Sequence, residues 1–187
     1  MEMKLDGIYL PIYRNLWIYW ITIAIGTALL PFDNIACSLI GIALNLVGLY
    51  QMYQMRGASE GLAKAFRLWV IALALTIGGL LLTLLALGSA LAVLLLLVSL
   101  AGVIMLLVAQ YFFYAALRDL AQARAYDYPP QRIMWIFYLA LGGGIVMAIL
   151  NGLQMTLAGI ILNIAVQVVS LALLWQYLQA VGQNENG

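Results

Sequence analysis

Apolar residues along this chain gather in six long runs, separated by short connections that hold nearly all of the charged residues. The runs fall at about 15–31, 35–54, 67–87, 90–116, 132–150 and 155–180. Each is near the roughly 20 residues that a helix needs to cross the hydrocarbon core of a bilayer. Because an unpaired backbone N–H or C=O group is costly in lipid, each run must be helical. The pattern predicts an all-α integral membrane protein with six transmembrane helices.

Composition agrees with this prediction. Hydrophobic residues make up 66% of the 187 residues and charged residues only 8%, whereas a soluble domain carries about a quarter charged residues. We therefore expect residues 1–187 to form a single transmembrane domain surrounded by lipid. The net charge of +1 supplies no basic field, which excludes nucleic acid as an expected partner.

The eight basic residues indicate the orientation. They all fall before the first run, between the second and third, or between the fourth and fifth: Lys4, Arg14, Arg56, Lys64, Arg67, Arg118, Arg124 and Arg132. The opposite turns, around Asp33, Gly88 and Asn151, hold none, and Asp33 is expected to cap the second helix. Because basic loops stay in the cytoplasm, the sequence predicts a multi-pass protein of the plasma or inner membrane with both termini cytoplasmic.

The short opposite turns predict three antiparallel hairpins, at about 15–54, 67–116 and 132–180. Each hairpin begins with an arginine, a tryptophan two or three residues later, and a glycine nine residues after the tryptophan. The tryptophan and glycine pairs are Trp17 and Gly26, Trp69 and Gly78, and Trp135 and Gly144. We interpret this as a diverged threefold repeat whose glycines lie at equal depth, each close to another helix backbone. The alternative is that Arg and Trp mark any cytoplasmic helix start.

Two details of the basic connections can be predicted. Ser59 is placed to cap the third helix, in which Glu60 and Lys64 have the spacing of an ion pair on one helix face. The fourth helix is expected to run on through Ala125, until the segment Tyr126-Asp127-Tyr128-Pro129-Pro130 stops it.

Aromatic side chains are concentrated in the half of the protein nearest the basic connections, whereas interfacial belts normally form at both surfaces. This asymmetry predicts an inner-facing, aromatic-rich cavity between the hairpins. The candidate ligand-binding residues are Trp20, Asn45, Tyr50, Gln110, Tyr111 and Tyr138. The alternative is a plain interfacial belt. The amides Asn45, Asn163 and Gln167 either join helices by hydrogen bonds or line a polar cavity.

Catalysis is not expected. The chain has no histidine, which removes the commonest metal ligand and acid/base catalyst, and it holds no metal-binding pair, nucleophile elbow or phosphate loop. We expect no metal site and no cofactor.

The favoured function is therefore non-enzymatic binding or transport of a small or amphipathic molecule. The alternative is an accessory or scaffold subunit without a substrate of its own, which docks a larger membrane complex or a second copy of the chain through faces rich in small residues.

In length, in its six expected spans and in the pair Ala24 and Ala28, the chain resembles the substrate-binding membrane component of energy-coupling-factor vitamin transporters. Those components bind their vitamin near the outer face under a substantial loop, whereas the turns on that side of this chain are very short. The resemblance therefore assigns no site residue here.

Overall fold

The computed structural model of the chain describes residues 12–29, 35–86 and 90–186, and within these ranges the regular structure is entirely helical. The elements are α1 (Tyr13–Leu29), α2 (Ile35–Met55), the short 3-10 helix η1 (Arg56–Ala58), α3 (Glu60–Leu85), α4 (Ala90–Ala123), α5 (Arg132–Gly152) and α6 (Thr156–Asn186). The all-α prediction is confirmed. Five helices, α2 to α6, are long and apolar enough to cross a membrane, and α1 contributes 17 described residues.

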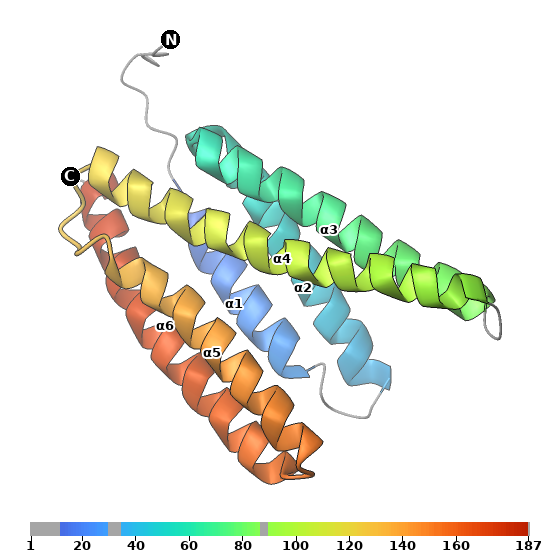
Figure 1. Ribbon diagram of the computed structural model, residues 1–187. Coiled ribbons are helices and arrows are strands. Elements are labelled where there is room, and N and C mark those ends of the chain that lie inside the picture. Colours follow the sequence, from blue (N-terminus) through green and yellow to red (C-terminus); the bar gives the residue numbers. More distant parts are fainter. Residues whose placement is uncertain (1–11, 30–34, 87–89, 187) are drawn as a thin grey trace.

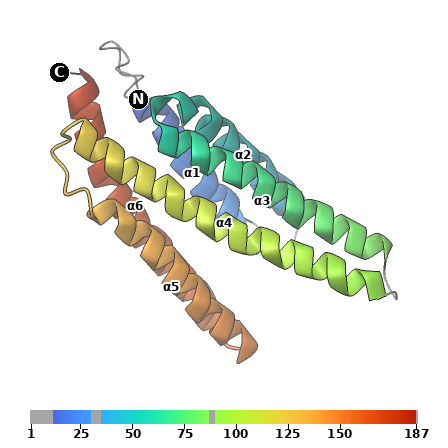
Figure 2. The same ribbon diagram turned by 45° about the horizontal axis from the view of Figure 1, so that its top comes forward.

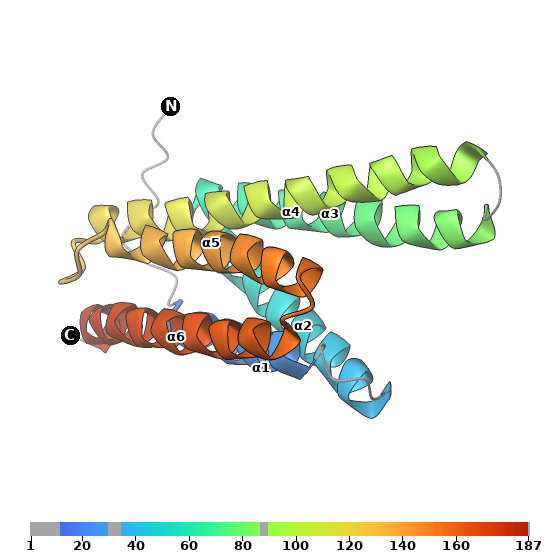
Figure 3. The same ribbon diagram turned by 60° about the horizontal axis from the view of Figure 1, so that its bottom comes forward.

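The helices form a closed ring in which each packs against its neighbours in the chain and α6 packs against α1. Packing is most extensive within three consecutive pairs, α1 with α2, α3 with α4, and α5 with α6. The pairs converge at one end of the molecule and spread apart at the other (Figures 1, 2 and 3). The described basic residues lie at or near the converging end, which we call the basic end, and the opposite end is the far end.

The hydrophobic core lies at the basic end. It combines the first turns of α1, α3 and α5 with the last turns of α2, α4 and α6. Its members include Leu16, Trp20, Met52, Leu62, Phe113, Leu117, Ile133, Tyr177 and Val181. The Tyr177 hydroxyl donates to the Leu117 carbonyl at 2.9 Å, which ties α6 to α4 inside this core. Towards the far end most large apolar side chains are exposed, as expected for surfaces that face lipid.

The predicted roles of the repeat glycines are wrong at two of three positions. A side chain at Gly26 would meet the Gly41 carbonyl of α2 at 2.9 Å, as expected. Gly78 and Gly144 instead have nothing within 4 Å, and their neighbours Gly79 and Gly143 make the close approaches. A shift of one residue turns a helix by about 100°, so equal spacing from tryptophan does not fix the packed face. The threefold repeat stays a prediction.

The start of α3 is partly as predicted. Ser59 caps the helix, accepting a hydrogen bond from the Leu62 backbone N–H at 3.1 Å. The predicted pair between Glu60 and Lys64 is wrong, because the Lys64 ammonium lies 4.0 Å from the centre of the Phe112 ring on α4. A cation over a ring face is attracted by the ring quadrupole, and tertiary packing offers this partner where the helix alone offers only Glu60.

Helix α4 ends at Ala123, two residues before the predicted end. Ala125 has a positive φ of 50°, and the Tyr126 backbone N–H returns to the Ala121 carbonyl at 3.0 Å. Together with the bond from the Ala125 backbone N–H to the Gln122 carbonyl at 3.3 Å, this is a Schellman motif, and it ends the helix two residues earlier than predicted. The proposed cap Asp33, the turn at Gly88 and residue Lys4 lie outside the described residues.

Candidate functional site

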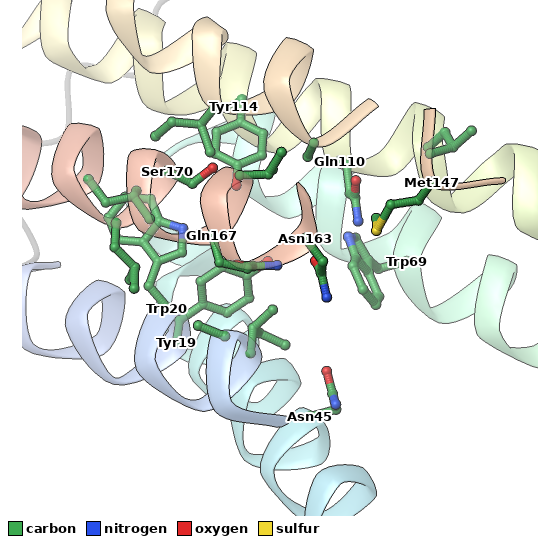
Figure 4. A pocket seen from close by; sticks show the side chains of 18 residues that line it. Tyr19, Trp20, Asn45, Trp69, Gln110, Tyr114, Met147, Asn163, Gln167 and Ser170 are labelled. Carbon is green, nitrogen blue, oxygen red and sulfur yellow. The ribbon is translucent and has the colours of Figure 1, made fainter. Parts of the chain in front are cut away.

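A cavity of about 380 Å³ lies inside the helix ring, and all six helices line it. The lining residues are Tyr19, Trp20, Ile23 and Ala24 of α1, Asn45 of α2, Trp69 of α3, Leu107, Gln110 and Tyr114 of α4, Ile136, Ala140 and Met147 of α5, and Asn163, Val166, Gln167, Ser170, Leu171 and Leu174 of α6. Figure 4 shows these side chains around the cavity. The volume falls in the range of small-molecule sites, about 300–1,000 Å³.

The cavity lies on the far side of the core from the basic end. On α6 the core runs from Leu174 to Val181, whereas the cavity residues run from Asn163 to Leu174. The same order holds on α4, where Gln110 lies eight residues before Arg118, about 12 Å along the helix. Half the hydrocarbon thickness is about 15 Å. The cavity therefore lies near the middle of the spans, with the packed core between it and the basic end.

Four side-chain amides line the cavity: Asn45, Gln110, Asn163 and Gln167. The Asn45 amide donates to the Gly41 carbonyl in its own helix at 2.8 Å. The other three make no hydrogen bond to any residue that the structure describes. Asn163 and Gln167 lie one turn apart on α6, and in Figure 4 their amides point into the same space as that of Gln110. These groups are available to water or to a ligand.

Aromatic rings form much of the remaining wall. Tyr19 packs on Phe113 of the core with ring centroids 4.9 Å apart, and Trp20 meets Tyr177 edge-on at 6.2 Å. The indole nitrogen of Trp69 is buried without a hydrogen-bond partner among the described residues. The indole nitrogen of Trp20 is also buried without a hydrogen-bond partner among the described residues.

The structure brings together three of the six candidate residues, Trp20, Asn45 and Gln110. Tyr50, Tyr111 and Tyr138 do not line the cavity and are 57%, 40% and 54% exposed. Tyr50 stacks on Tyr53, and the other two rings contact the buried Phe137 from the outside. Exposed rings near one end of the helices agree with the alternative of an interfacial belt. We leave these three residues out of the candidate site.

Sequence reasoning missed four of the polar and aromatic residues that line the site. The sequence pattern places Trp69 in the repeat and gives no individual role to Tyr19, Tyr114 or Ser170. Two of them lie close in sequence to predicted site residues and could have been found in this way. Tyr19 adjoins Trp20, and Tyr114 lies one turn after Gln110. Nothing in a uniformly apolar span says which of two adjacent rings faces inward.

None of the described residues that line the cavity is charged. Across the described ranges 12–29, 35–86 and 90–186, no group of three or more potential ligands is placed to hold a metal ion. The side chains at hand can form hydrogen bonds, stack on rings and exclude water.

Comparisons with protein-family models, with curated proteins and with solved structures give no significant match. The resemblance to the vitamin-transporter component gains no support from them.

Proposed function

We propose that this chain is a six-span membrane protein that binds a small molecule in the cavity or transports it through the cavity. The molecule enters the cavity from the far end. Three unpaired amides near the middle of the spans carry this proposal. A polar group left unpaired in an apolar setting costs free energy, and an amide that joins helices would have a protein partner. Binding sites at this depth between helix repeats are a recurrent feature of membrane transporters.

The direction of access follows from the core and the charges. If the basic end is cytoplasmic, as the distribution of Arg and Lys predicts, the core closes the cytoplasmic side of the cavity. The inner-facing access expected from the aromatic residues is therefore replaced by access from the outer side or from the lipid between the spread helix pairs.

Purification tests the binding function. We expect native mass spectrometry of the detergent-purified protein to find a small molecule on the wild type and on Ala148→Trp, but not on Ala140→Trp. Both alanines are exposed residues of α5, and only Ala140 lines the cavity, so the pair separates filling of the cavity from a general effect of tryptophan. Equal loading of the two variants would contradict the proposal.

One observation favours the accessory-subunit alternative. Gly142 and Gly144 of α5 have nothing within 4 Å, and small residues let another membrane helix approach closely. A stoichiometric protein in the same purification, lost from Gly144→Leu and retained by Ala140→Trp, would support this alternative.

A further inference from the structure

We propose that the ligand of the cavity is an uncharged, planar ring compound whose edge carries a hydrogen-bond donor beside an acceptor, as in a lactam or a cyclic imide. The inference deepens the proposed function and rests on it. It is carried by three kinds of group in one cavity, namely amides, an unpaired indole N–H and aromatic walls, and by the lack of a charged side chain among the described lining residues.

The ligand is uncharged because the described lining residues include no charged side chain that could neutralise a charge. The polar side chains among them are all amides, hydroxyls or indoles. An ion moved from water to a site near mid-bilayer loses hydration, and without a counter-ion this loss is not recovered. Carboxylates, phosphates and ammonium compounds are therefore disfavoured.

The ligand has a polar edge because the amides need partners. Each of Gln110, Asn163 and Gln167 offers both an acceptor oxygen and an NH₂ donor, and the Trp69 N–H is a donor only. A lipid chain or another pure hydrocarbon in the cavity would leave all these groups unpaired. A compound with adjacent N–H and C=O groups matches an amide with two hydrogen bonds, and a further acceptor would pair the Trp69 N–H.

The ligand is planar because aromatic rings form much of the cavity wall. Tyr19, Trp20, Trp69 and Tyr114 place four ring systems around the cavity, and aromatic rings favour offset stacking or edge contacts. At about 380 Å³ the cavity lies near the lower limit of small-molecule sites, which suits one or two fused rings.

The test uses three probes built on the same frame of two fused rings: 2-quinolone, a neutral lactam; naphthalene, which has no polar edge; and quinoline-2-carboxylate, an anion. Each is titrated into the purified protein in detergent while the midpoint of thermal unfolding, Tm, is recorded. We expect 2-quinolone to raise Tm saturably and to bind at least about tenfold more tightly than naphthalene, as two hydrogen bonds predict. The carboxylate should leave Tm unchanged.

Variants locate the effect. Gln167→Leu and Gln110→Leu should each weaken 2-quinolone binding by about fivefold, whereas Gln176→Leu, at an exposed position of α6 outside the cavity, should not. Trp69→Phe should weaken binding while keeping the ring, with Trp135→Phe as the exposed control.

The outcomes separate the two proposals. If naphthalene or the carboxylate raises Tm as much as 2-quinolone and Ala140→Trp abolishes the effect, the cavity binds ligands but the proposed class is wrong. If none of the probes raises Tm, the class is also wrong, and the co-purification experiment still decides the function by itself.

Discussion

Gly78 and Gly79 are adjacent in α3, yet a side chain would meet different surroundings at each. At Gly79 a Cβ atom would lie 3.1 Å from the Ser99 backbone nitrogen and 3.2 Å from the Leu95 carbonyl of α4, whereas at Gly78 nothing lies within 4 Å. Backbone cannot move aside as a flexible side chain can. We expect Gly79→Leu to lower the free energy of unfolding by about 1–3 kcal/mol.

The control for this prediction is Gly78→Leu, which should be neutral or stabilising because leucine favours a helix over glycine by up to about 1 kcal/mol. Thermal unfolding of both variants in the same detergent measures the difference. Equal loss of stability would show that Gly78 is packed as well.

Tyr128, in the connection between α4 and α5, is buried and its hydroxyl has no hydrogen-bond partner among the described residues. Burial raises the pKa of Tyr128 to about 12 from its ordinary value of 10, although the nearby Arg132 acts in the opposite direction. The folded protein therefore holds the hydroxyl proton more tightly than the unfolded chain. The contribution of this proton to the free energy of unfolding is fully present below pH 10 and is lost as pH rises from 10 to 12.

Tyr128→Phe should therefore make the stability less sensitive to pH between 10 and 12, without destabilising the protein at pH 7, since it removes an unpaired buried hydroxyl. Tm measured at pH 7, 10 and 11 tests both parts. Parallel loss of Tm in the wild type and the variant would contradict the prediction.

At the scale of the element, the end of α4 stores backbone strain. The positive φ of Ala125 costs an L-residue roughly 1–2 kcal/mol that glycine avoids. Ala125→Gly should thus stabilise the protein by about 1 kcal/mol in thermal unfolding. Ala123→Gly, also exposed but in the last turn of the helix, should destabilise it by a similar amount. The opposite signs separate strain relief from a general effect of glycine.

At the scale of the molecule, the predicted topology can be tested with reporter fusions. Reporters placed in the 124–131 connection and after the C-terminus should read cytoplasmic, because the basic residues lie at that end. Reporters at Gly88 and Gly152 should read external. A cytoplasmic reading at either glycine would reject six spans.

The route into the cavity can be tested by chemical labelling. In a Cys37→Ala background, Asn163→Cys should react with a membrane-impermeant thiol reagent added to the outside of right-side-out vesicles. Ala116→Cys, in the core, should not react from either side. Labelling of Asn163→Cys only from the inside would contradict closure of the cavity at the basic end.

The sequence alone determined the helices, their approximate ends and the segregation of positive charge. These features follow from local rules: a span must be long and apolar, its backbone must be hydrogen-bonded, and prolines and capping residues limit it. Ser59 was recognised as a cap for this reason, since its partner Leu62 is only three residues away.

Only the tertiary structure decided which side chains face inward. In a soluble helix the polar face identifies the exposed side, but a helix in lipid is apolar all round, so its hydrophobic pattern carries little information about facing. Trp20 therefore lies inside and Tyr50 outside although both are aromatic residues of the same half of the protein. Likewise Lys64 meets Phe112, distant in sequence, because contacts between helices depend on packing that no local spacing encodes.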